Sequence, residues 1–388
     1  MLKQLYSSLF FLYFFFLFLF SKSFAVLNYS GVYITEFFIL LYLFILVILL
    51  IINKRIIFPK YMFVLIATYI IYGTLILILN EININSLKDY VIISYSIFIF
   101  IAFHLANNLS IKNPFKYIKL FLILISIIFI NNFFQLTDHF IILNIVPLGL
   151  VILASFIFSR NVNKSTTILL TLISLICVSN SLIFYFNRSF FIGLIFSLIF
   201  IKLINKNIIL KRLSYIDIFK YLLFFLSISL ISYLFFDISH SGTASWRIEV
   251  WNNVLEKFLG NTNFLYGNGF GFPVVEPSDI PDNAITNHPH NSFITILYQL
   301  GLIGFVLFFC AIFYFIASSI FFLRIYSVYY KNINYKFFAL FFCFFMYCFL
   351  FSFNNVALEG PHHGIWFWSS IGFALSFKRK FLGNLNKI

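Results

Sequence analysis

The residues best suited to chemistry in this sequence lie in the stretch NHPHNSFITILYQLGLIG, residues 287–304. His288, His290 and Asn291 run there directly into an apolar segment long enough to enter a membrane. Histidine accepts and donates protons near neutral pH. Polar groups at such a junction lie beside lipid headgroups yet stay accessible to water, so the position suits proton transfer on a substrate that is itself anchored in lipid.

Two arginines supply a second useful kind of side chain, because a guanidinium binds phosphate through a planar fork of donors. Arg188 lies in a short turn between apolar runs, and Arg247 lies in the longest polar stretch. Each has a structural alternative: Arg188 as a cation that snorkels to the membrane interface, and Arg247 as the partner of Glu249 or of a headgroup. Six of the seven histidines fall on the same predicted side of the membrane, which indicates a site on that face.

A run of alternating glycines, YGNGFGF, precedes the histidines in the same polar stretch. No predicted strand comes before Gly267, Gly269 and Gly271, and no dinucleotide-binding signature follows them, so the run is a weak candidate for a phosphate loop. A turn that lets two backbone segments approach closely is the better interpretation.

The composition determines what kind of scaffold holds these residues. Of 388 residues, 62% are hydrophobic, 10% are charged and 60 are phenylalanine, which lies far outside the range of soluble domains. We therefore predict an all-α, polytopic membrane protein with about twelve transmembrane helices. The predicted helices are residues 5–21, 31–53, 61–79, 90–106, 118–134, 140–158, 166–186, 190–204, 220–236, 292–323, 337–353 and 365–377.

The distribution of charge predicts the orientation. With the N-terminus inside, most of the 26 lysines and arginines fall in cytoplasmic loops, and nearly all of the 12 acidic residues fall outside. The net charge of +14 is thus a topology signal and does not indicate nucleic-acid binding. The first run, residues 5–21, resembles a signal peptide, but its length favours an uncleaved first helix.

One predicted loop is long enough to be functional. We predict that residues 237–291 form an external loop between the ninth and tenth helices. This loop divides the single membrane domain into residues 1–236 and residues 292–388, the latter with three helices and a cytoplasmic tail. Within the loop, SWRIEVWNNVLEKFL predicts an amphipathic helix with Ser245 as its N-cap. The predicted apolar face consists of Ile248, Trp251, Leu255 and Phe258. Resting on lipid headgroups and shaping a site are equally open roles for it.

The spacing of the histidine stretch resembles a family signature. His290 and Asn291, followed after nine residues by Gly301 and after two more by Gly304, match the pattern of the O-antigen ligase family, His-Asn, nine residues, Gly-x-x-Gly. SGTASWRIEVW is similar to the arginine-containing entry to the family's long loop, and GNGFG to its glycine turn. FNRSFFIGLIFSL resembles an earlier Ser-Arg segment, with Asn187 where serine is usual.

This resemblance, which covers about residues 180–305 well, implies a metal-independent, inverting glycosyltransferase of the bacterial inner membrane with a C-type glycosyltransferase fold. It implies a glycan donor on undecaprenyl diphosphate at the periplasmic face and an acceptor that is the lipid A core or another glycan. Membrane lipids surround the protein, and neither a cofactor nor nucleic acid takes part. The implied site residues are His290 as catalytic base and Arg188, Arg247, Asn291 and His288 as substrate-binding residues.

The glycines of the signature are expected to be structural. Gly301 and Gly304, three residues apart on the tenth helix, would let another helix pack closely and so hold the end of the loop in place. Gly267, Gly269 and Gly271 would form the glycine turn.

Alternatives stay open for the site and for the class of protein. His290 would, as an isolated residue, more often cap a helix or bond a carbonyl, and His288 has no carboxylate or cysteine at a persuasive spacing for a shared metal.

A polymerase of lipid-linked repeats, a protein O-oligosaccharyltransferase and a lipid-linked glycan flippase are the competing functions. Carriers usually place ionisable residues at the membrane midplane, where this sequence has few, His104 being the main exception.

Overall fold

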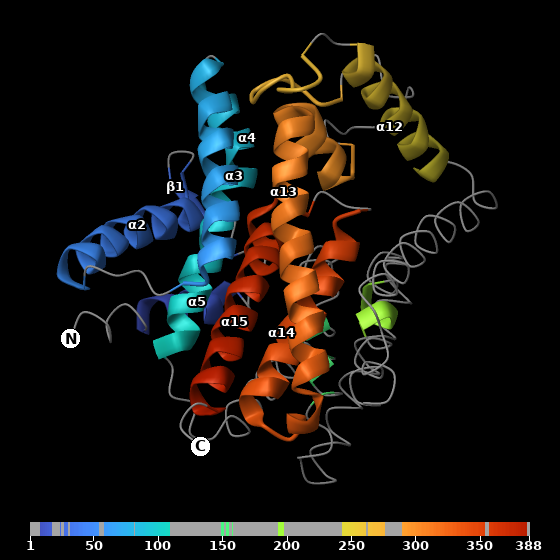
Figure 1. Cartoon of the computed structure of the whole chain (residues 1–388). Helices are drawn as coiled ribbons and strands as arrows, with labels where there is room; N and C mark the ends of the chain where they lie inside the picture. Colours follow the sequence, from blue (N-terminus) through green and yellow to red (C-terminus); the bar gives the residue numbers. More distant parts are fainter. Residues whose placement is uncertain are drawn as a thin grey trace, which may run out of the picture.

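The computed structural model describes residues 8–17, 24, 27–29, 32–53, 58–80, 82–108, 149–150, 153–154, 157, 193–197, 243–260, 263–275, 289–353 and 357–385. This part of the chain is helical apart from one short antiparallel hairpin. Its first elements are the helix Ser8–Leu17, the strands β1 (Asn28–Tyr29) and β2 (Val32–Tyr33), and helix α2 (Ile34–Asn53). In Figure 1, α2 lies across the direction of the other long helices.

The remaining long helices form a bundle, with one helix apart from it. The bundle helices are α3 (Lys60–Leu79), α4 (Ile84–Ser94) continued by η1 (Tyr95–Ile97) and α5 (Phe98–Asn108), α13 (Ser292–Ile325), α14 (Ile333–Phe351) after η4 (Ser327–Tyr329), and α15 (Pro361–Leu385). Helix α12 (Thr243–Gly260) lies at one end of this bundle (Figure 1). Segments distant in sequence pack side by side, α3 against α13 and α5 against α15. This pairing brings the two halves of the chain together around one core.

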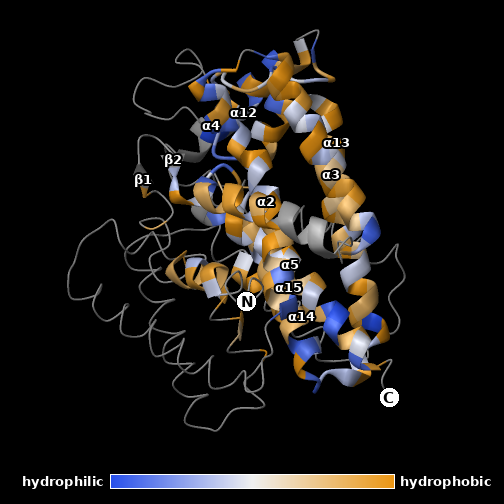
Figure 2. Ribbon diagram, turned by 90° about the vertical axis from the view of Figure 1, so that its left-hand side faces the viewer, coloured by the Kyte–Doolittle hydropathy of each residue, from blue (hydrophilic) through white to orange (hydrophobic). Residues whose placement is uncertain are grey.

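Four helical segments among the described residues are long and apolar enough to cross a bilayer: Lys60–Leu79, Ile84–Asn108, Ser292–Ile325 and Ile333–Phe351. Figure 2 shows the apolar colouring along the middle of the bundle, with polar residues toward its two ends. The protein is therefore an integral membrane protein. The predicted spans at 118–134, 166–186 and 220–236, and most of those at 140–158 and 190–204, lie outside the described residues.

Polar residues mark where several of the helices begin. Asn83 caps α4 in a capping box, since its side chain accepts from the amides of Asn85 and Ser86 while the Ser86 hydroxyl accepts from the Asn83 amide. Asn332 caps α14 in a related way. These caps satisfy helix-terminal amides that lipid cannot satisfy.

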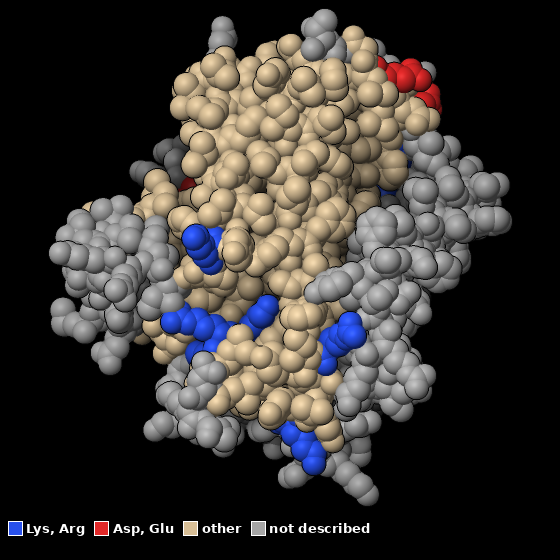
Figure 3. All heavy atoms as spheres, viewed as in Figure 1, with Lys and Arg blue, Asp and Glu red and all other residues tan. Residues whose placement is uncertain are grey.

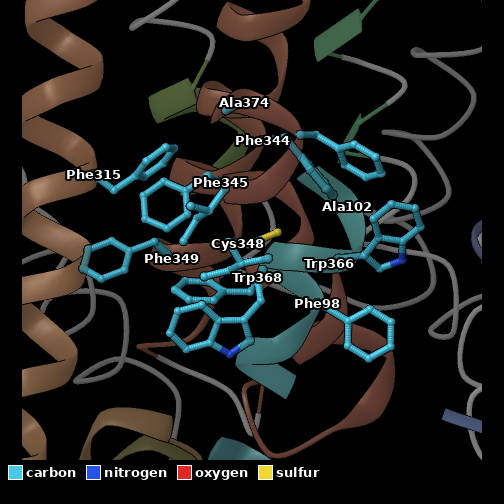
Figure 4. Packing of buried hydrophobic residues seen from close by; sticks show 14 of the residues in the cluster. Phe98, Ala102, Phe315, Phe344, Phe345, Cys348, Phe349, Trp366, Trp368 and Ala374 are labelled. Carbon is cyan, nitrogen blue, oxygen red and sulfur yellow. The ribbon is translucent and has the colours of Figure 1, made fainter. Parts of the chain in front are cut away.

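Aromatic side chains fill the core between α5, α13, α14 and α15 (Figure 4). The Phe315 ring meets the Phe345 ring edge-on at 5.0 Å, and Phe345 in turn packs against Phe367. At the contact of α5 with α15, a Cβ on Gly372 would clash with the Ile99 carbonyl. The close approach of these two helices therefore requires glycine at that position.

Two helix boundaries differ from the prediction. Helix α15 continues to Leu385, so residues 378–385 are its last turns rather than a separate tail; Phe381 is buried there among aromatic rings of Phe322 and Tyr326. The predicted span at 90–106 begins earlier, at Ile84, because Asn83 supplies the cap. The helix Ser8–Leu17 buries Phe14 against α5 and α15, which are the contacts of a bundle helix.

The predicted amphipathic helix is present as α12, and Phe258 of its predicted apolar face is buried, but the rest of the buried face differs from the prediction. Val250, Val254 and Phe258 are buried at a spacing of four residues, whereas Leu255 is only half-buried. The face is rotated because α12 packs on the first part of α13 rather than on lipid alone. Ser245 is not the N-cap, since α12 already begins at Thr243 and nothing between these residues breaks a helix.

Candidate active site

Helix α13 is broken near its start, although the sequence predicts one continuous run over 292–323. Gly301 has φ +67° and ψ −172°, values that no helical residue adopts. The break separates a short helix, residues 292–300, from a long one, residues 302–325. A Cβ on Gly301 would clash with the Leu265 carbonyl, so glycine is required both for the backbone conformation and for this approach.

The break exposes backbone groups that other segments satisfy. Residues 263–269, which we call the glycine turn segment, form hydrogen bonds with four of these backbone groups. The hydroxyl of Tyr72 on α3 donates to a fifth. The five hydrogen bonds are Asn268 N to Tyr298 O (2.9 Å), Gly269 N to Gln299 O (3.0 Å), Leu302 N to Phe264 O (3.0 Å), Ile303 N to Leu265 O (3.1 Å) and Tyr72 Oη to Leu300 O (3.0 Å). The break is thus a fixed feature of the fold.

The alternating glycines form the close-approach turn that their spacing predicts. Gly267, Gly269 and Gly271 all have positive φ, between +79° and +90°. A Cβ on Gly267 would stand 2.5 Å from the Gln299 carbonyl oxygen, and the Gly271 amide donates to the Asp89 carboxylate at 2.9 Å. The run binds protein backbone, so in the described residues it acts as structure and not as a phosphate loop.

Of the two signature glycines, Gly301 does not have the expected role of letting another helix pack closely. Gly301 approaches the glycine turn segment and not a neighbouring helix. Gly304 does face a helix, since its Cβ would stand 3.0 Å from the Tyr72 ring of α3. The nine residues between Asn291 and Gly301 correspond to the short helix, which explains the spacing of the motif.

His290 stands at the start of this short helix in a strained conformation. Its φ is +51°, which makes it the one described residue other than glycine with positive φ. The next residue, Asn291, is 7% exposed and caps α13, because its Oδ1 accepts from the amides of Phe293 and Ile294. The cap is thus Asn291 and not His290. Since the Oδ1 is used in the cap, a contact of Asn291 with substrate stays a prediction for its amide nitrogen.

Helix α12 holds the other side of His290. The Trp251 indole nitrogen donates to the carbonyl oxygen of Pro289, the residue before His290. Arg247 precedes Trp251 by one helical turn, and residues four apart lie on the same helix face. Half-buried Arg247 therefore lies on the side of α12 that faces the start of α13. Of the two roles left open for α12, this arrangement favours shaping the site.

A carboxylate that sequence reasoning did not select also reaches the start of α13. Ser292 is fully buried and its hydroxyl donates to Glu359, which lies in the connection between α14 and α15. The same hydroxyl oxygen accepts from the amides of Ala357 and Leu358, both at 3.0 Å. The proline and glycines of the EGPHHG stretch indicate a turn, but no spacing in the sequence connects it with Ser292.

Not all of the other candidate site residues lie in the part of the chain that the structure describes. Arg188 and His288 lie outside the described residues, so their roles stay predictions. His363 lies in the first turn of α15 and its ring stacks on Phe351 at 4.9 Å. The structure thus brings together His290, Arg247 and Glu359 within one end of the bundle.

The two ends of the bundle differ in charge, as Figure 3 shows. Basic side chains gather toward the C-terminal end, where α3 begins and α13 ends, and acidic atoms of this view lie at the opposite end beside α12. The described basic residues of the C-terminal end are Lys60, Arg324, Lys331, Lys336, Lys378, Arg379 and Lys380. The candidate site lies at the end away from them.

These features define a class of protein: an integral membrane protein of apolar helices with a polar, histidine-containing site built at one end of its bundle. The family follows from sequence comparison, since the model of the O-antigen ligase family matches residues 89–309, more than half of the chain. The chain belongs to that family, whose activity is glycosyl transfer of the ligase or polymerase type. The match starts well before the region expected from the motifs alone. No curated protein matches the sequence.

Proposed function

We propose that this protein is an O-antigen ligase-type glycosyltransferase that moves a glycan from undecaprenyl diphosphate to a lipid A-core acceptor at the periplasmic face. The observation that carries the proposal is the conformation of His290. A residue with left-handed backbone is retained at a cost, and such residues cluster at active sites where their surroundings fix them. Here α12 and the Asn291 cap fix it from two sides.

The division of chemical work follows from the two oxygens that exchange at the anomeric carbon, the attacking acceptor oxygen and the departing diphosphate oxygen. An acceptor hydroxyl is a poor nucleophile, so His290 removes its proton as general base. The diphosphate is already a good leaving group, and Arg247, together with Arg188, stabilises its charge. Direct attack at the anomeric carbon inverts its configuration and forms no glycosyl-enzyme. No step requires a metal ion.

The same site suits a polymerase, which differs only in its acceptor. Among the alternatives, transfer to another lipid-linked repeat is the second candidate because the family covers both reactions. Transfer to protein and flipping of the donor rank lower. The surface glycan of a deletion strain distinguishes the first two: long lipid-linked chains that accumulate unattached indicate a ligase, and single repeats attached to the core indicate a polymerase.

The experiment that tests the site uses proteoliposomes with a defined lipid-linked donor. We expect His290→Ala to lower transfer by about 10²–10⁴-fold, the usual contribution of a general base, while the protein still inserts and binds donor. His288→Ala is the matched control and should cost far less. A wild-type rate in His290→Ala, or a dead His288→Ala, would remove His290 as the base.

The arginine assignment is tested in the same vesicles. Arg247→Ala and Arg188→Ala should abolish transfer, and Arg→Lys should restore only part of it, because lysine keeps the charge but loses the bidentate fork. Full activity in both alanine variants would place the diphosphate elsewhere.

The orientation, the twelve spans and the division at residues 237–291 stay predictions, and the charge difference between the two ends supports the first of them. In intact spheroplasts, Glu256→Cys on the exposed side of α12 should react with an impermeant thiol reagent. Lys331→Cys at the opposite end should react only after lysis. The reverse pattern would contradict both the orientation and a periplasmic site.

A further inference from the structure

The connection between α14 and α15 binds the start of α13 through a single buried serine. A serine hydroxyl has one proton to donate and two lone pairs to accept with. Ser292 uses all three, on Glu359 Oε2 and on the amides of Ala357 and Leu358. Its own amide donates to the Ser352 carbonyl at 3.2 Å. The hydroxyl and the amide of Ser292 therefore both bond to the connection between α14 and α15, at Ser352 and at residues 357–359.

This anchoring lies next to the strained residue. Two residues of chain span at most about 7 Å, so whatever fixes Ser292 also restricts His290. A non-glycine residue with φ +51° relaxes unless its neighbours hold it. The Trp251 bond to Pro289 holds the preceding side, and the Ser292 bonds hold the following side. Without the second set, the first residue of the short helix would lose its hydrogen bonds to the α14–α15 connection.

The carboxylate suits this role for two reasons. An ionised acceptor makes a shorter and stronger hydrogen bond than a neutral one. Glu359 also lies at the N-terminal end of the short helix, where a negative charge is favourable. Both effects hold the Ser292 hydroxyl in one orientation, which in turn leaves its lone pairs aimed at the two amides.

We propose that Glu359 is a positioning residue for His290, acting through Ser292, so that the α14–α15 connection forms part of the active site. The proposal rests on His290 being the base of the proposed reaction. It assigns no proton transfer to Glu359. The position of the Glu359 oxygen matters more than the charge of the carboxylate. A small displacement of a catalytic group is enough to lower a rate by about 10²-fold.

Two conservative substitutions separate reach from charge. Glu359→Gln keeps an acceptor oxygen at the same distance and loses only the smaller contribution of the charge, so we expect kcat to fall by no more than about threefold. Glu359→Asp keeps the charge but withdraws the oxygen by one methylene, and we expect kcat to fall about 10- to 100-fold with little change in KM for the donor. Glu256→Asp, at an exposed site on α12, is the matched control and should not change either constant. An inactive Gln variant beside an active Asp variant would overturn the proposal.

A coupling test checks that the effect passes through Ser292. Ser292→Ala should lower kcat about as much as Glu359→Asp, and the double variant should lose no more than the worse of the two, because both break the same contact. Losses that multiply would show that Glu359 acts independently and would contradict the positioning role.

A readout without glycan keeps this test separate from the proposed function. Carbethoxylation of His290 by diethyl pyrocarbonate, followed by peptide mass spectrometry, reports the surroundings of the imidazole. The rate of carbethoxylation of His290 should change several-fold in Glu359→Asp and in Ser292→Ala, and it should not change in Glu256→Asp. Unchanged rates in both would overturn the proposal even if the enzyme transfers glycan. Changed rates in a protein whose His290→Ala variant is fully active would support the positioning and reject the base.

Discussion

The two parts of α13 differ in what holds them. The short helix, residues 292–300, buries Ser292, Thr295 and Gln299 among protein, and its ends are fixed by named hydrogen bonds at Asn291 and at the Gly301 break. The long helix, residues 302–325, is held by aromatic packing along its length, as at Phe315. Hydrogen bonds fix both ends of the short helix, whereas apolar contacts predominate along the long helix, which accepts hydrogen bonds from other helices toward its end, at Ser318 and Leu323.

This difference follows from the medium. Lipid tails are as apolar as a phenylalanine side chain, so packing in the bilayer supplies affinity but few directional constraints. Polar contacts are directional, and they are costly in lipid unless each group finds a partner. We infer that the chain concentrates them in the short helix because that is where a side chain must be placed accurately. Variants of each part should therefore fail in different ways.

The largest effect is expected at the break itself. Gly301→Ala places a Cβ against the Leu265 carbonyl at a positive φ, which costs about 1–3 kcal/mol in strain before the clash is counted. We expect transfer to fall at least about 100-fold, because the short helix can no longer dock on the glycine turn segment. Activity is measured per inserted molecule. Gly260→Ala, with nothing within 4 Å of the added carbon, should behave as wild type.

A Gly301→Ala variant with full activity would show that the break is not needed for the site. In that case the short and the long helix would be one functional unit, and the contrast between them would have no consequence for chemistry.

A moderate effect is expected at the cap. Asn291→Ala removes the acceptor for two amides and should lower the stability of the capped short helix by about 1 kcal/mol. This corresponds to a decrease of roughly fivefold in the equilibrium constant for forming that helix end. Asn291→Asp keeps the acceptor and should stay near wild type. Thermal unfolding in detergent and the transfer rate are measured together.

The same pair of variants decides whether Asn291 also binds substrate. If its amide nitrogen donates to a sugar, Asn291→Asp should lose transfer while keeping its thermal stability. A stable and fully active Asp variant would restrict Asn291 to capping.

The features of the candidate site that depend on residues close together in the sequence could be predicted. The resemblance to the family signature singled out His290 and Asn291, the glycine run predicted a close-approach turn, and SWRIEVW predicted a helix. The family match confirms the resemblance based on these motifs. The lengths of the apolar runs also located the described membrane helices to within several residues.

What the sequence did not reveal depends on contacts between distant segments. The break at Gly301 is invisible in an apolar run, because the groups that satisfy it come from residues 263–269 and from Tyr72. Glu359 is separated from Ser292 by two helices. The buried face of α12 is set by the short helix against which it packs, so hydrophobic periodicity alone selected Phe258 correctly but missed Val250 and Val254.

The smallest effect on transfer is expected in the long helix. Phe315 is fully buried, and its ring packs edge-on against Phe345 and Phe342. Phe315→Ala opens a cavity that would cost about 3–5 kcal/mol in a soluble core, an upper limit here because lipid competes with protein for the same apolar surface. The thermal midpoint in detergent should fall, while the transfer rate per folded molecule changes less than about twofold. Phe313→Ala is the matched control on the same helix, since Phe313 is 40% exposed and should change neither quantity. A Phe315→Ala protein that keeps its midpoint but loses transfer would mean that the long helix also positions the reacting groups, because a packing residue acts on the rate only through the amount of folded protein.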